Sequence, residues 1–162
     1  MSITKKEEMK TDKKSLSKLF YFIEDIMTIV VRNNADKSSN KKLNKIFECL
    51  GEANIKLKSY FKRVFHYSKH DVKSLIYALA IIDKLILQEL IVVNRLNMHS
   101  VILTALLLSF KFLEDSPYTN KVYSLILGIN LDVLNIFEKE MLEALGYKIF
   151  IKEEDFMKYV KY

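Results

Sequence analysis

The sequence predicts an all-α, single-domain protein built around one central buried helix. Gly occurs three times and Pro once among 162 residues, and so few backbone breakers favour long helices over a sheet built on tight turns. Half of the residues are hydrophobic, which is enough for one compact core. Several segments also repeat apolar residues at intervals of three and four, the period of one helix face.

The N-terminal part is expected to contain a charged tail and then a helix. Residues 1–15 carry almost no apolar side chains, so this tail is expected to be disordered. From Leu16 an apolar repeat predicts a helix. A polar connector follows it, and then a short helix that ends near Gly51. Residues 16–50 are therefore assigned to the N-terminal helix and connector.

Two amphipathic helices are expected next. The first covers residues 55–67. Ser68 and Asp71 have the spacing of a capping box and predict that a second helix opens over about 70–88. Residues 90–96 are compatible with a helix tail and with an extended connector, so that assignment stays open.

The central helix is expected to follow Asn97, its predicted cap. Residues 101–110 are uncharged and apolar on nearly all sides, which indicates a helix surrounded by others. Ser116-Pro117 ends this unit. Further helices are expected over 120–127 up to Gly128, from a cap at Asn130 to Gly146, and over 153–162.

Two charged residues fall on strongly apolar helix faces. On a 3.6-residue repeat, Lys111 shares a face with Leu108. Glu138 lies four residues after Leu134 and four before Leu142. A charge among leucines must be paired, hydrogen-bonded or available to a partner.

Each of these charges also has a simpler explanation. Lys111 stands at a helix end, from which a long side chain can extend into water. Glu138 can pair with a local lysine, Lys139 or Lys148. The residues alone leave both alternatives open.

Asp83 is a third charge on a core-facing position, four residues after Leu79. We expect it to have a structural role. Its expected partner is a lysine of the preceding helix, Lys56 or Lys58, in a salt bridge.

The sequence carries no recognisable catalytic, metal-binding or cofactor-binding motif. It has no glycine-rich loop that could hold a nucleotide. His66 and His70 are four apart, but the expected helix boundary at Ser68 falls between them, which spoils a ligand geometry along one helix face. We therefore expect a binding protein without cofactor or metal, with an enzyme as a remote alternative.

The net charge of +6 is interpreted mainly as a solvated surface, because lysines and acids are interleaved along the chain. An acidic partner surface is the second interpretation and nucleic acid the third. The single Cys49 fits a reducing compartment, and neither a signal peptide nor a membrane-spanning segment is evident. The expected location is intracellular, in cytoplasm, nucleus or both, without a membrane partner.

Several segments, taken in order, resemble a known family. Residues 77–85 (YALAIIDKL) resemble the cyclin-box signature around Tyr-Ile-Asp-Arg. Residues 97–99 (NMH) and 109–115 (SFKFLED) resemble its Asn-Val-His and Ala-Lys-Phe-Asp-Asp segments, and 128–131 (GINL) resembles the Gly-Ile-Ser-Leu that opens the fifth box helix. The combined pattern resembles the P-type, also called U-type, cyclins over roughly 54–160.

This resemblance implies one five-helix cyclin box within residues 51–162, with an additional N-terminal helix and a short C-terminal helix. It also implies a cyclin-dependent protein kinase as partner, with the chain monomeric alone and heterodimeric with the kinase. Lys111 and Glu138 match the Lys and Glu that grip backbone groups near the regulatory helix of the kinase. The apolar part of that contact is expected to comprise Leu108, Phe112, Leu142, Tyr147 and Ile149.

Three features depart from the wider cyclin pattern. Lys84 stands where the signature has Arg, the Met-Arg-Ala-Ile-Leu substrate-docking patch is absent, and the sequence holds one box where many cyclins have two. The alternative function is a cyclin-box scaffold that binds a transcription or nucleic-acid partner without any kinase.

Overall fold

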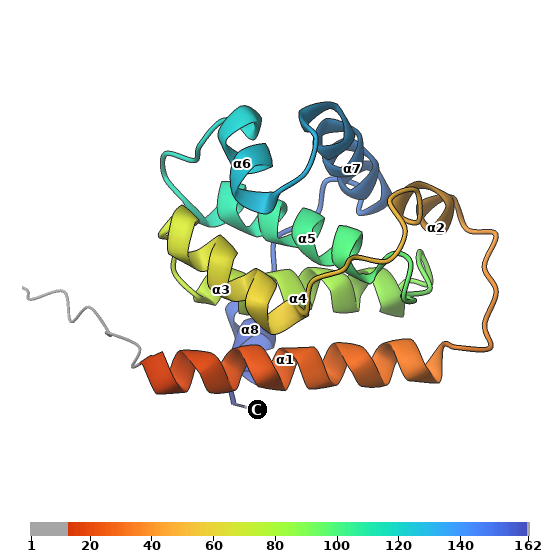
Figure 1. Ribbon diagram of the computed structural model, residues 1–162, viewed down its shortest axis with the longest axis horizontal. Helices are drawn as coiled ribbons and strands as arrows, with labels where there is room; N and C mark the ends of the chain where they lie inside the picture. The colour runs from red at the N-terminus through yellow and green to blue at the C-terminus, as the bar shows by residue number, and fades with distance from the viewer. Residues whose placement is uncertain (1–12, 162) are drawn as a thin grey trace, which may run out of the picture.

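Residues 13–161 are described by the computed structural model, and they form eight α-helices with no strand among them (Figure 1). The prediction of an all-α fold is confirmed. The helices α3 to α7 take the places of the five expected box helices, with α1 and α2 before them and α8 after them. The bounds are α1 Lys13–Asn33, α2 Lys42–Phe47, α3 Leu57–Ser68, α4 Lys73–Leu87, α5 Met98–Leu113, α6 Asn120–Leu127, α7 Leu131–Ala144 and α8 Glu153–Val160.

The helix α5 is the centre of the fold, as predicted. Every residue from Ser100 to Phe110 is buried, because α4 and α7 pack on this helix (Figure 1) and the Phe110 ring meets Phe65 of α3 and Tyr123 of α6. Two of its buried hydroxyls find partners within the helix: Thr104 donates to the Ser100 carbonyl at 2.7 Å and Ser109 to the Ala105 carbonyl at 2.9 Å. No fully buried side-chain nitrogen or oxygen in the described part of the chain lacks a hydrogen-bond partner.

The helix α1 lies along one side of the domain, packed on α3 (Figure 1). Phe20 joins the two helices through ring contacts with Phe61 and Phe65, at centroid distances of 5.6 and 5.8 Å. The helix begins at Lys13, three residues before the expected start at Leu16. The rest of the expected tail, residues 1–12, lies outside the described residues.

Residues 88–97 form a non-helical connector with turns at 88–89 and 95–97, so the segment 90–96, which the sequence left open, is a connector and not a helix tail. Buried asparagines hold this connector. Asn44 accepts from the Val92 amide at 2.9 Å and donates to its carbonyl at 2.8 Å, and Asn97 donates to the same carbonyl. Asn97 precedes α5 as expected, but its side chain binds the connector and does not cap the helix.

Helix ends in the second half follow the sequence closely. Asn130 caps α7 by accepting from the amides of Asp132 and Val133, and Gly128 ends α6 in the left-handed conformation at φ 69°. The start of α4 differs from its prediction. Asp71 accepts from the amide of Lys73, so the helix begins at Lys73 and not near residue 70.

An extended segment over residues 148–152 connects α7 to α8. The Tyr77 hydroxyl on α4 holds it by donating to the Ile149 carbonyl at 3.0 Å and accepting from the Ile151 amide at 2.9 Å. This attachment places α8 against α4.

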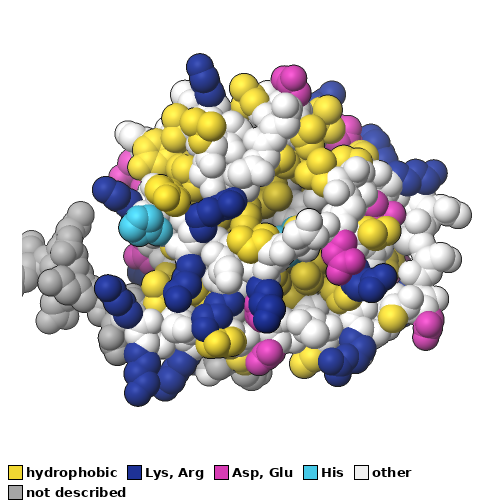
Figure 2. All heavy atoms as spheres, viewed as in Figure 1, with side chains coloured by type: hydrophobic (Ala, Val, Ile, Leu, Met, Phe, Trp, Pro, Cys, Tyr) yellow, Lys and Arg dark blue, Asp and Glu magenta, His cyan; other side chains and the backbone are white. Residues whose placement is uncertain are grey.

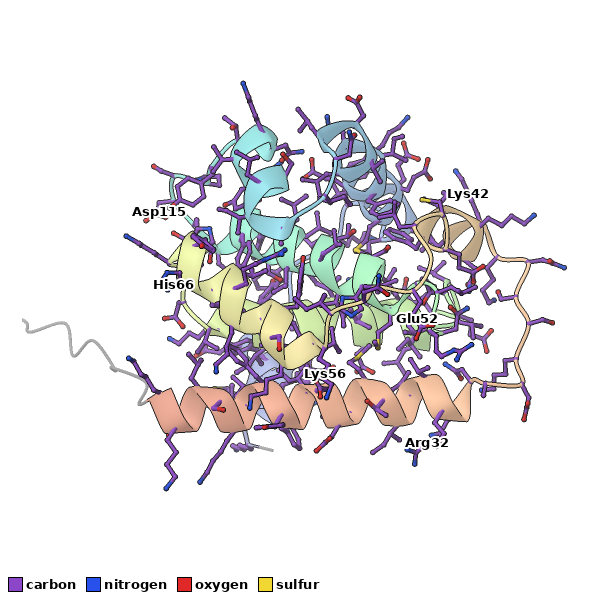
Figure 3. The ribbon with its side chains drawn as sticks, viewed as in Figure 1. Arg32, Lys42, Glu52, Lys56, His66 and Asp115 are labelled. Atoms are coloured by element: carbon purple, nitrogen blue, oxygen red, sulfur yellow. The ribbon has the colours of Figure 1, made fainter. Side chains whose placement is uncertain are left out.

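The expected salt bridge of Asp83 with Lys56 or Lys58 is wrong. Asp83 instead accepts a hydrogen bond from the Tyr159 hydroxyl on α8, and no ion pair involves Asp83 within residues 13–161. Lys56 directly precedes α3, whose first turn faces α1 (Figure 3), and the Lys58 ammonium lies 3.4 Å from the centroid of the Tyr21 ring on α1. Asp83 keeps a structural role, but it joins α4 to α8.

Candidate functional site

Lys111 and Glu138 form an ion pair with each other, on helices that cross near the surface. The last turn of α5 carries Lys111 and the middle of α7 carries Glu138. The Lys111 Nζ atom donates to Glu138 Oε2 at 2.8 Å. The two core-facing charges that the sequence singled out are thus brought together.

Two asparagines complete this arrangement. Asn120 begins α6; its Oδ1 accepts from Lys111 Nζ at 2.9 Å, and its Nδ2 donates to Glu138 Oε1 at 3.1 Å and to Asn135 Oδ1 at 2.8 Å. The sequence analysis did not identify either asparagine as part of the site. The loop between α5 and α6 brings Asn120 to the ion pair, and the sequence does not show where that loop leads. We call Lys111, Asn120, Asn135 and Glu138 the docking network.

The docking network is not sealed from solvent. The Lys111 side chain is 34% exposed and that of Glu138 is 16% exposed. An ammonium has three donors and a carboxylate about four acceptor positions, and the internal bonds of these two groups use two donors and two acceptors. The pair therefore keeps a hydrogen-bond donor and acceptors available while it is internally paired.

The simpler pairing of Glu138 with Lys139 or Lys148 is not formed. Lys139 instead approaches Glu143 on the same helix at 3.9 Å. The backbone carbonyl of Lys148 accepts from Lys84 Nζ. Glu138 has Lys111 as its ionic partner in the described part of the chain.

The expected apolar contact residues separate into buried and accessible positions. Leu108 is 2% exposed and belongs to the core around α5, so it offers little surface in the free chain, and its contact with a partner stays a prediction. Phe112 is exposed at the end of α5 and stacks on Tyr77 at 5.5 Å between centroids.

The other expected apolar residues lie at the surface or near it. Leu142 is half-buried on α7, one turn after Glu138 and on the same face. Tyr147 is exposed in the turn after α7, and Ile149 is half-buried in the following extended segment. Their part in binding stays a prediction.

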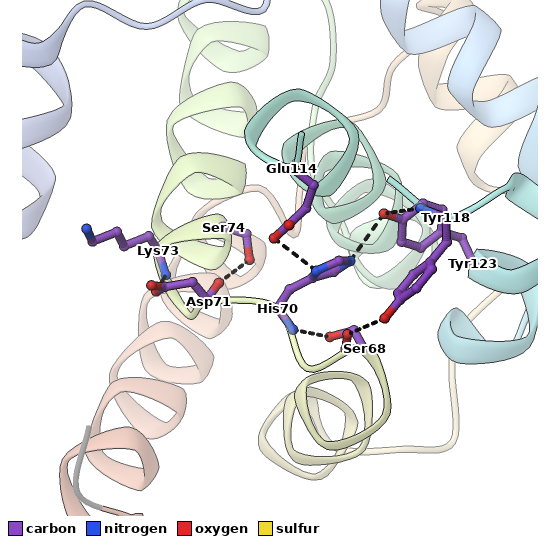
Figure 4. Close-up of polar contacts among 8 residues, drawn as sticks. All are labelled: Ser68, His70, Asp71, Lys73, Ser74, Glu114, Tyr118 and Tyr123. Carbon is purple, nitrogen blue, oxygen red and sulfur yellow. Dashed lines mark hydrogen bonds and ion pairs between the residues drawn. The ribbon is translucent and has the colours of Figure 1, made fainter. Parts of the chain in front are cut away.

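A second polar cluster lies on the other side of loop 114–119, the segment between α5 and α6 (Figure 4). The His70 ring, 7% exposed, has Nδ1 at 3.0 Å from a Glu114 oxygen and Nε2 at 3.2 Å from the Tyr123 hydroxyl. The Tyr123 hydroxyl also accepts from the Tyr118 amide, and the Tyr118 hydroxyl donates to the Ser68 carbonyl. We call Ser68, His70, Glu114, Tyr118 and Tyr123 the histidine cluster.

Burial sets the protonation of this cluster. It lowers the pKa of His70 below its ordinary value of 6.5, while the Glu114 carboxylate opposes the shift. Burial likewise raises the pKa of Tyr123. A neutral imidazole that donates from Nδ1 to Glu114 and accepts at Nε2 from Tyr123 satisfies both contacts of the ring.

Three features of the structure concern metal binding, membrane spanning and the distribution of positive charge. No group of three or more His, Cys, Asp or Glu residues with metal-binding geometry occurs within residues 13–161. None of the helices in that range is long and apolar enough to cross a membrane. Figure 2 shows Lys and Arg as separate groups, several over α3 and the adjacent part of α1, with apolar and acidic side chains between them.

The arrangement of helices around the buried α5 is consistent with the cyclin-box fold. A family model described as cyclin matches residues 4–149. The chain therefore belongs to the cyclin family. Membership supports a regulatory and not a catalytic role.

Plant cyclins are among its relatives. The chain is 28% identical to Cyclin-U4-3 of Arabidopsis thaliana over 130 residues, which are 80% of this chain and 59% of that protein. It is 25% identical to Cyclin-U4-1 of the same plant over 91% of this chain and 75% of the relative. It is 24% identical to Cyclin-P3-1 of Oryza sativa subsp. japonica over 80% and 56%. The chain thus spans between about half and three quarters of these relatives, and the resemblance to U-type and P-type cyclins is confirmed.

Proposed function

We propose that this chain binds a cyclin-dependent protein kinase and activates it by stabilising the active position of the kinase's regulatory helix. The observation that carries the proposal is the partly exposed ion pair between Lys111 and Glu138. Membership of the cyclin family supports it. The residues that match the family's kinase-gripping Lys and Glu are the same two residues.

The spare groups of the docking network suit a backbone partner. Every helix end leaves amides or carbonyls without an intrahelical partner. The remaining donor of Lys111 can bind a carbonyl, and the remaining lone pairs of Glu138 can accept from amides. Exposed Phe112 and Tyr147 would exclude water around these bonds and so strengthen them.

Activation then needs no chemistry from this chain. The kinase is active when an ion pair forms between its ATP-site lysine and a glutamate of the regulatory helix. A partner that binds this arrangement better than the inactive one raises its population by the difference in binding free energy. The cyclin domain supplies that difference through the docking network and the apolar residues around it.

The test is a charge exchange. Affinity purification with mass spectrometry identifies the kinase, and binding and kinase activity are then measured with the wild type and the Lys111→Glu/Glu138→Lys variant. The exchange keeps an internal ion pair but reverses the groups that meet the partner. We expect an unchanged circular dichroism spectrum together with loss of kinase binding and activation.

The matched control is Lys139→Glu/Glu143→Lys, which exchanges an exposed pair on the same helix α7 and should leave kinase binding unchanged. Wild-type affinity in the Lys111/Glu138 exchange would show that the pair serves only the fold. Recovery of DNA or RNA in a salt-sensitive complex, with no kinase, would favour the scaffold function.

A further inference from the structure

A groove of about 840 Å³ lies between the second half of α4, the segment before α8, and α8 itself. None of the residues expected to contact the kinase lines it. Phe150, which lines it, follows Ile149 directly in the chain, and its ring lies 6.4 Å from that of Phe112 between centroids. The groove is therefore a neighbouring but separate surface.

The groove is positively charged. Lys84, Lys152, Lys158 and Lys161 line it, against Asp83 and Asp155. Both carboxylates are engaged internally: Asp155 pairs with Lys158 at 2.8 Å, and Asp83 accepts from Tyr159.

The other lysines of the groove have charge to offer. Within residues 13–161, Lys152 and Lys161 form no ion pair, and both are exposed. Lys84 donates to a backbone carbonyl and keeps further donors. The groove thus presents uncompensated cationic groups.

The same groove has an apolar surface. Leu87 and Phe150 are 75% and 66% exposed, and both line it. The fold imposes the orientation of Phe150. Tyr77 holds the backbone of Ile149 and Ile151; side chains alternate along an extended segment, so the half-buried isoleucines pack inwards while Phe150 lies on the outer side.

We propose that this groove docks an acidic peptide segment of a partner protein, with an apolar side chain between Leu87 and Phe150 and carboxylates at Lys84, Lys152 and Lys161. Charge complementarity selects an anionic partner. A groove of this volume suits a short segment. A peptide can place its acids away from Asp83 and Asp155, whereas nucleic acid carries a negative charge at every nucleotide.

The test uses a fluorescent synthetic peptide of twelve residues, with a central Leu-Phe flanked by glutamates. Anisotropy should show binding to the wild type that weakens as salt rises from 50 to 300 mM. Lys152→Glu/Lys161→Glu should weaken binding at least tenfold. The control Lys45→Glu/Lys62→Glu has the same charge change at exposed lysines outside the groove and should stay within twofold. Circular dichroism verifies the fold of each variant.

The peptide itself supplies further controls. Replacing its Leu-Phe by Ser-Ser should weaken binding at least fivefold, and so should Leu87→Ser in the protein. Equal affinity for the serine peptide, equal affinity for single-stranded DNA or anionic vesicles, equal loss in the control variant, or no binding of the acidic peptide would each overturn the proposal. The inference does not depend on the kinase, and Lys152→Glu/Lys161→Glu should bind the kinase as the wild type does.

Discussion

The docking network and the histidine cluster both attach to loop 114–119 or to the helix ends beside it, and they differ in which hydrogen-bonding groups they leave available to a partner. In the histidine cluster, a buried ring has a partner at each nitrogen, and both tyrosine hydroxyls are bonded (Figure 4). In the docking network, the Lys111 ammonium and the Glu138 carboxylate meet each other and still reach solvent.

This difference in exposure predicts a difference in role. Glu114 and Tyr118 are partly exposed, but removing a partner of the buried His70 ring leaves a buried nitrogen unpaired, which lowers stability. A partly exposed pair contributes little to folding but can contribute to a complex in which it becomes desolvated. The comparison therefore predicts a larger effect on stability at the His70 ring and, under the proposed function, a larger effect on kinase binding at the docking network.

The largest effect should come from the double variant Lys111→Ala/Glu138→Ala. We expect kinase affinity to fall about 30-fold or more, since truncating desolvated charged groups costs at least about 2 kcal/mol. The free energy of unfolding should fall by about 1 kcal/mol or less. Calorimetry of binding and urea unfolding measure the two. The pair Lys139→Ala/Glu143→Ala is the control, and a loss of stability without a loss of affinity would break the comparison.

Tyr123→Phe should have the opposite profile. It leaves His70 Nε2 and the Tyr118 amide without their shared partner, so the free energy of unfolding should fall by about 1–3 kcal/mol with kinase affinity unchanged. Urea unfolding measures the change. Tyr67→Phe, at an exposed tyrosine, should be neutral; equal effects of the two variants would contradict a structural role of the Tyr123 hydroxyl.

Acid should weaken the fold through its buried histidines. Burial lowers the pKa values of His70 and His99 in the folded chain, so the unfolded chain binds more protons. The contribution of these histidines to the free energy of unfolding is then fully present above the unfolded pKa near 6.5. It is lost as pH drops below that value, by at most about 1.4 kcal/mol per pH unit for each histidine. Unfolding measured between pH 7.5 and 5.5 should show this slope. His70→Gln should reduce it, whereas His66→Gln, at an exposed position, should leave it unchanged.

The smallest effect tests how the docking network is held. Asn120→Ala removes an amide that orients both charges but leaves their direct bond. Kinase affinity should fall about three- to fivefold, equivalent to about 0.7–1 kcal/mol. Asn135→Ala removes one exposed bond to Asn120 and should change affinity less than twofold. An effect of Asn120→Ala as large as that of the double variant would make Asn120 itself a binding residue.

The sequence predicted the parts of this molecule that depend on local periodicity. The uncharged run in α5 indicated the centre of the fold, and the helical repeat placed Lys111 and Glu138 on apolar faces. It could not distinguish a buried residue from an accessible one on the same face, and so it did not show that Leu108 is buried in the free chain. Periodicity gives direction around a helix but not depth below the surface.

Contacts between segments distant in the chain could not be predicted from the sequence. Asp83 was expected to bind a lysine in the preceding helix, yet its partner is Tyr159, 76 residues later. Asn120 was expected only as the start of a helix, and His70 was placed inside α4 when it lies in the turn before it. Each of these depends on how loops bring helices together, which no local pattern records.

The fastening of loop 114–119 at both ends has a geometric consequence. Glu114 is held by His70 and Asn120 by the ion pair, so the loop must span a fixed distance between two attached residues. Residues 115–119 have no regular secondary structure. A change in loop length that keeps both attachments must therefore be accommodated within these five residues, as surface loops ordinarily accommodate insertions.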